Sequence, residues 1–219
     1  MILEGPIVPP EVASFIKFFD PEAMVITAGD VRKALAQYQR DGVGEVEFMI
    51  NSPGGSYFET SSLVSMVSEW PGTINTTVTG LAASGAGLLT MVTNRVRMSS
   101  MAMLMIHQAW SMREGNSQDM HNEAEILEKM DERQMEVISK RSGMDKEEAY
   151  SAMQKETWYT ATEAVSVGLA NEVMAFDQMN KGKHKKDKKK AMIGSEREIW
   201  DAAMDRSVAF TMDRLPAFL

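Results

Sequence analysis

Two side chains combine a suitable chemical type with a suitable position for nucleophilic catalysis. Ser84 lies between Ala83 and Gly85 where an apolar helix is expected to begin, so its hydroxyl is unhindered and nearby backbone N–H groups can face a developing anion. His107 follows the apolar segment 103–106, and an imidazole at a strand tip can remove a proton from a hydroxyl. Both residues also have a structural interpretation, because small residues favour close helix packing and histidine often serves as a simple hydrogen-bonding group.

A glycine-rich turn at residues 51–56 is a further chemical feature. Its sequence NSPGGS lacks the GxxxxGK[ST] and GxGxxG patterns of phosphate-binding loops, so nucleotide binding is not indicated. Two adjacent glycines can bring a bare backbone N–H close to a substrate carbonyl, although a tight turn with positive φ explains them equally well. The sequence AASGA around Ser84 differs from the GxSxG motif and so disfavours an α/β-hydrolase. The chain has no cysteine, which excludes thiolate nucleophiles and cysteine-bound metals.

The elements that would position these groups alternate between strands and helices. Segments in which apolar and polar residues alternate, or that are rich in β-branched residues, predict strands. Apolar residues that recur at intervals of three and four positions predict helices. The expected strands are residues 45–50, 73–79, 95–98, 103–106 and 171–174, and the expected helices are residues 27–41, 63–70, 82–92 and 117–140. Capping boxes at residues 145–148 and 160–163 mark further helix starts, and Gly143 is expected to end the long helix. This order indicates an α/β domain with a largely parallel sheet, in which functional groups gather where strands end.

The composition limits the class of protein. The chain of 219 residues has 23 Lys and Arg against 31 Asp and Glu, and its net charge of −8 argues against a general nucleic-acid-binding surface. The run from Lys181 to Lys190 holds seven lysines and one aspartate, which is typical of a solvated linker or of a contact for an acidic partner. No signal-peptide pattern or membrane-length apolar segment is present, so we expect a cytoplasmic protein without cofactor, metal or membrane contact.

Four sequence blocks together resemble one family. They are INSPGGS at residues 50–56, GLAASGAG at 80–87, MLMIHQ at 103–108 and ETWYTATEAVSVGLANEV at 156–173. In this order they resemble the ClpP family of self-compartmentalising serine peptidases, with particular likeness to its phage- and prophage-encoded branch. The resemblance implies a ClpP/crotonase-like spiral of ββα units with an extended handle helix, for which residues 117–140 are the candidate. It also implies a ring-forming homo-oligomer that acts on polypeptide substrates.

The resemblance further implies roles for individual residues. Ser84 is expected to be the nucleophile and His107 the general base, with the backbone N–H groups of Gly55 and Gly85 as the oxyanion hole. The third catalytic residue of the family is an aspartate, and Glu156 stands at that position here. A glutamate can orient an imidazole in some hydrolases, but its carboxylate lies one methylene further from the backbone.

The predicted organisation has four parts. They are a proline-rich N-terminal arm (1–25), a ClpP-like peptidase domain (26–175), a lysine-rich linker (176–194) and a C-terminal helical extension (195–219). Family members that work with an unfoldase have a segment that forms axial loops ahead of the family's first strand, and this chain is expected to begin almost at that strand. An AAA+ unfoldase is therefore a possible partner but is not expected to be required. The favoured function is a phage-associated serine endopeptidase, such as a capsid-maturation protease, in the host cytoplasm or a virion precursor. The alternatives are a crotonase-fold acyl-CoA enzyme and a catalytically idle assembly protein.

Overall fold

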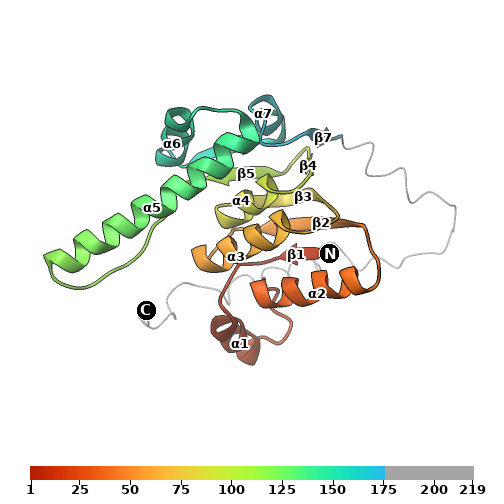
Figure 1. Ribbon diagram of the computed structural model, residues 1–219, viewed down its shortest axis with the longest axis horizontal. Helices are drawn as coiled ribbons and strands as arrows, with labels where there is room; N and C mark the ends of the chain where they lie inside the picture. The colour runs from red at the N-terminus through yellow and green to blue at the C-terminus, as the bar shows by residue number, and fades with distance from the viewer. Residues whose placement is uncertain (176–219) are drawn as a thin grey trace, which may run out of the picture. The chain divides into compact units, whose positions relative to one another are not determined.

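The computed structural model describes residues 1–175 as an α/β domain (Figure 1). The strands are β1 (Ile2–Glu4), β2 (Glu45–Ser52), β3 (Thr73–Ala83), β4 (Arg95–Ser99), β5 (Met103–Ile106), β6 (Thr157–Thr160) and β7 (Glu172–Met174). The helices are α1 (Pro10–Phe19), α2 (Ala28–Arg40), α3 (Tyr57–Ser68), α4 (Gly85–Met91), α5 (Ser117–Ser142), α6 (Lys146–Gln154) and α7 (Ala161–Ser166). Both predicted capping boxes are confirmed at the starts of α6 and α7. The predicted linker and C-terminal extension lie outside the described residues.

The strands described here form one mixed sheet of seven strands, most of them parallel. Its main path runs β1-β2-β3-β4-β7 with parallel neighbours, while β5 pairs in parallel with the end of β3 and antiparallel with β6. The expected α/β class with a largely parallel sheet is therefore confirmed. A spiral of ββα units remains a prediction. β3 continues four residues beyond its expected end at residue 79 and delivers Ser84 directly from a strand into a helix.

One face of the sheet holds the hydrophobic core. Alternate residues of β2, namely Val46, Phe48 and Ile50, are buried, as expected for a strand with one face inward. They form one core with buried side chains of α2, α3 and α4, and these three helices lie side by side in Figure 1. This packing supports the ends of β2 and β3, where the glycine turn and Ser84 are found.

Residues 1–25, predicted as an arm, supply an edge strand and a helix. β1 pairs with β2, and Ile7 is fully buried. The Ile7 N–H donates to the Gly54 carbonyl at 2.8 Å, and the Ser56 N–H donates to the Ile7 carbonyl at 2.8 Å. The prolines permit this arrangement, because Pro10 starts α1 at a position where a helix needs no N–H donor. The N-terminal segment therefore supports the glycine turn.

The long helix α5 ends at Gly143 with φ 82°, which confirms the predicted C-cap. In Figure 1 its first half extends away from the sheet, and Met120 in that half is exposed. Its buried residues are Asp131, Gln134 and Ile138, all in the second half. The side chains that α5 buries fully therefore come from its second half, and two of them are polar. A handle role for α5 remains a prediction. None of the described helices is long and apolar enough to cross a membrane.

Candidate active site

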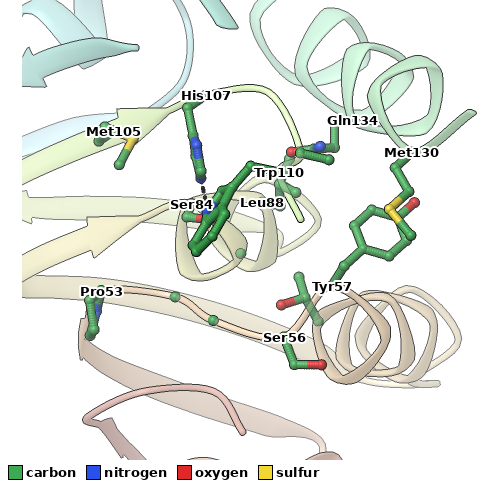
Figure 2. Close-up of a pocket in the computed structure, with 15 residues that line it drawn as sticks. Pro53, Ser56, Tyr57, Ser84, Leu88, Met105, His107, Trp110, Met130 and Gln134 are labelled. Carbon is green, nitrogen blue, oxygen red and sulfur yellow. Dashed lines mark hydrogen bonds between the residues drawn. The ribbon is translucent and has the colours of Figure 1, made fainter. Parts of the chain in front are cut away.

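Ser84 and His107 meet at the carboxyl ends of two neighbouring strands. β3 and β5 pair in parallel up to Ala83 opposite Met105, so the residues that follow emerge at the same edge of the sheet. The Ser84 Oγ and the His107 Nε2 lie 2.7 Å apart (Figure 2). At this distance an imidazole with an unprotonated Nε2 can accept the proton of the hydroxyl.

The backbone of Ser84 is strained. Its φ of 54° and ψ of −125° lie in a region that residues with a side chain rarely adopt, at a cost of about 1–3 kcal/mol. The Ser84 N–H donates to the Met105 carbonyl at 2.9 Å, and the Leu88 N–H donates to the Ser84 carbonyl at 3.1 Å. A serine on a strained turn from strand to helix has the geometry of a nucleophile elbow, although the surrounding sequence lacks the GxSxG motif.

The glycine turn lies directly against this junction. A Cβ on Gly54 would come within 2.8 Å of both the Gly85 nitrogen and the Ser84 Cβ, and the φ of Gly54 is +85°. Only glycine therefore permits this approach. Within residues 1–175, no hydrogen bond uses the N–H of Gly55 or of Gly85, and both residues line the same cleft as Ser84. These two N–H groups are available to an acceptor beside the serine hydroxyl.

The cleft has a volume of about 580 Å³ and is lined mainly by apolar groups. In Figure 2, Tyr57 from α3 and Met130 from α5 lie across the cleft from Ser84 and His107. Burial raises the pKa of the Tyr57 phenol, Arg133 acts in the opposite direction, and the negative charge of Asp131 adds to the increase. The phenol is therefore a neutral hydrogen-bonding group at neutral pH.

Glu156 lies close to His107 in the strand register but is not joined to it. Ile106 of β5 and Thr157 of β6 are the last pair of the two strands, and His107 directly follows Ile106 while Glu156 directly precedes Thr157. No hydrogen bond among the described residues connects the Glu156 carboxylate to His107. The Trp158 Nε1–H donates to the Glu156 Oε1 at 3.3 Å, and the backbone of Glu156 has a φ of 49°. The structure thus brings Ser84 and His107 together and places Glu156 one strand away.

The residues that α3 and α5 contribute to the cleft were not predicted from the sequence. They include Tyr57, Thr60, Met130 and Gln134. Thr60 is 2% exposed, and its hydroxyl is buried without a partner among the described residues. On α5, the buried residues 131, 134 and 138 share one helix face, but two of them are polar, so no apolar periodicity in the sequence marked this face.

A hydroxyl and an imidazole at hydrogen-bond distance, with unused backbone N–H groups beside them, form the arrangement found in serine hydrolases. The family model described as Clp protease matches residues 17–177. The chain therefore belongs to the Clp protease family, whose members are serine-type peptidases.

Proteins with similar sequences are proteolytic subunits of Clp proteases, and their sequence identity to this chain is low. The ATP-dependent Clp protease proteolytic subunit 3 of Rhodococcus jostii is 28% identical over 156 residues, which cover 70% of this chain and 72% of the relative. Subunit 1 of the same protease from Chlamydia abortus is 28% identical over 162 residues, or 72% of this chain and 84% of the relative. The Bacteroides fragilis proteolytic subunit is 26% identical over 132 residues, or 59% of this chain and 64% of the relative. The chain thus spans less than two thirds of the Bacteroides relative.

Proposed function

We propose that the chain is a serine endopeptidase in which Ser84 is the nucleophile and His107 the general base. The observation that carries this proposal is the 2.7 Å contact between the Ser84 Oγ and the His107 Nε2. As the Oγ bonds to the substrate carbonyl carbon, its proton moves to Nε2, and that proton then passes to the leaving amine as the C–N bond breaks. A water molecule, activated by the same imidazole, hydrolyses the acyl-enzyme and restores the serine.

The oxyanion hole in this proposal consists of the N–H groups of Gly55 and Gly85. Negative charge develops on the substrate carbonyl oxygen during the attack, and two fixed N–H donors stabilise it most strongly where water is excluded. The unused donors of both glycines, in the same cleft as Ser84, support this role. An acyl-CoA enzyme of the crotonase type needs two such donors but has no need of the Ser84–His107 contact, so the peptidase accounts for more of the site.

Glu156 is the proposed third member of the triad. Its position in the chain supports this role, because Glu156 directly precedes Thr157, which pairs with Ile106, the residue before His107. A carboxylate near Nδ1 would keep the proton on that nitrogen and leave Nε2 free to accept from Ser84. We expect Glu156→Gln to lower kcat by at least tenfold with little change in thermal stability. A kcat within about threefold of wild type would exclude the carboxylate from the triad.

The substrates in this proposal are polypeptides, and the working form is a ring-forming homo-oligomer. Family membership supports both statements, and the apolar cleft beside Ser84 supports the binding of a polypeptide. A role in a phage or prophage, such as capsid maturation, is the finer part of the proposal and is based on the likeness of the four sequence blocks. Activity without an AAA+ unfoldase is also part of it. Hydrolysis of a folded protein by the purified chain, with no ATPase present, would test that part directly.

The decisive experiment is labelling with a fluorophosphonate probe. The wild-type chain should be labelled, and Ser84→Ala should lose the label completely. Ser56→Ala is the matched control, because Ser56 also lines the cleft but lies on the glycine-turn side. Labelling that persists in Ser84→Ala would refute the assignment of the nucleophile. His107→Ala should abolish peptide hydrolysis. If the wild-type chain hydrolyses a peptide and His107→Ala does not, the chain is not a catalytically idle assembly protein.

A further inference from the structure

A buried carboxylate beside the cleft takes no part in the proposed proton transfer. Asp131, on α5, is 6% exposed. No salt bridge among the described residues includes it. A buried carboxylate is unfavourable unless hydrogen bonds replace the water it has lost, so its donors determine why it is stable there.

The donors to Asp131 come mainly from the segment that follows His107. The Ala109 backbone N–H donates to Oδ1 at 2.7 Å, and the Gln108 Nε2 donates to Oδ2 at 2.8 Å. A longer contact of 3.3 Å comes from Gln134 on the next turn of α5. Hydrogen bonds to a charged acceptor are stronger than neutral ones. If residues 108 and 109 moved away, the carboxylate would remain buried with its best donors lost. Asp131 therefore holds this segment against α5.

His107 is thus fixed from both sides. On its N-terminal side, Ile106 is paired in the sheet opposite Thr157. On its C-terminal side, Ala109 is bound by Asp131 two residues further along the chain. We propose that Asp131 is a positioning residue, which fixes the backbone on the C-terminal side of His107 so that the imidazole stays in contact with the Ser84 hydroxyl. This inference rests on the proposed peptidase function.

The test compares substitutions that remove or keep the hydrogen bonds of Asp131. Asp131→Ala removes them all. Asp131→Asn keeps one side-chain oxygen, which can still accept from the Ala109 N–H. Its new NH₂ group can donate to the Gln108 side-chain oxygen once the Gln108 amide has rotated by half a turn. We expect Asp131→Ala to lower both kcat and the rate of fluorophosphonate labelling by at least tenfold, because misplacing a reacting group by about 1 Å can cost a hundredfold. Asp131→Asn should stay within about threefold of wild type in both measurements.

Ile138→Ala is the matched control for a loss of stability. Ile138 lies on the same face of α5 and is fully buried, but it takes part in none of the hydrogen bonds to Asp131. This control should lower the melting temperature and keep the labelling rate of the folded protein. If Asp131→Ala does not fold, Asp131→Ser replaces it, since a serine hydroxyl is too short to reach Ala109.

The possible outcomes separate this inference from the proposed function. An unlabelled wild type would refute the peptidase proposal itself. A labelled wild type with normal labelling and kcat in folded Asp131→Ala or Asp131→Ser would overturn the positioning role, and so would a rise in KM alone. Equal losses in Asp131→Asn and Asp131→Ala would also overturn it, because the restored hydrogen bonds would then have no effect on His107.

Discussion

Gly85 lies so close to the Thr60 side chain that Gly85→Ala and Thr60→Ala should be strongly coupled in their effects on stability. A Cβ on Gly85 would lie 2.2 Å from the Thr60 Oγ1, 3.0 Å from its Cγ2 and 3.1 Å from its Cβ. Thr60 is 2% exposed, and a β-branched side chain in a helix has few alternative rotamers, so it cannot turn out of the way easily. Gly85→Ala should therefore lower the free energy of unfolding by about 2 kcal/mol, within the usual range of 1–3 kcal/mol for overpacking.

Thr60→Ala should have a much smaller effect on its own. It removes one buried methyl group, worth about 0.8 kcal/mol, but it also removes a hydroxyl that is buried without a partner among the described residues. These two effects act in opposite directions. In the double variant the Thr60 Oγ1 and Cγ2 are absent, and the remaining contact of about 3.1 Å can relax. The double variant should thus regain at least 1 kcal/mol of what Gly85→Ala loses.

Urea unfolding of the four proteins in the cycle measures this coupling, and fluorophosphonate labelling of the folded proteins provides the functional readout. Alanine keeps the N–H of residue 85, so slower labelling of Gly85→Ala would report a displaced backbone rather than a missing donor. The reasoning would be refuted if the two single effects were additive within about 0.5 kcal/mol, because the substituted side chains would then not meet.

Three further predictions concern elements around the site. Gly55→Ala should destabilise the chain by about 3 kcal/mol or more in thermal unfolding, because the φ of Gly55 is 148° and an added Cβ would lie 2.0 Å from the Ile7 carbonyl oxygen. Gly42→Ala is the control. Gly42 has a φ of 71° but open space around it, so this substitution should cost only about 1 kcal/mol. Asn116→Ala should cost about 1 kcal/mol in urea unfolding, since it removes the N-cap of α5, and an aspartate there should restore it. Hydrogen bonds from the Thr160 backbone and then from the Thr160 hydroxyl, at the N-cap of α7, lower the pKa of Glu163 below its ordinary 4.5. The Glu163 carboxylate therefore stabilises the fold at neutral pH, and this stabilisation is lost as the pH falls below about 4.5. The difference in urea midpoint between wild type and Glu163→Gln should disappear over the same pH range.

The strands and helices were largely predictable because their signals are local. The alternation at residues 45–50 identified β2, and the capping boxes located the starts of α6 and α7. The end of β3 was not predictable in this way. Gly80, Ala82 and Ala83 have little intrinsic preference for a strand, and it is the pairing with β5 on one side that keeps this segment extended.

The site was predictable only to the level of residue types. A serine among small residues and a histidine after an apolar strand are local signals, whereas the distance between them follows from the pairing of β3 with β5. Asp131 carried no such signal, since an aspartate in a long charged helix is usually exposed. Its burial depends on donors from residues 108 and 109, which no helical pattern contains. The placement of Glu156 depends in the same way on β6, which begins at the next residue and pairs with β5.

The groups proposed for catalysis are held by backbone contacts from distant parts of the chain. Ile7 bonds to both sides of the glycine turn that contains Gly55, although 48 positions separate the two residues. Met105 accepts from the strained backbone of Ser84, and Asp131 accepts from the segment after His107. Because each support is a single hydrogen bond or pair of bonds to a rigid element, small changes in these supports should alter the reactivity of Ser84 before they unfold the domain. Rate measurements on folded variants are therefore a more sensitive test of this site than measurements of stability.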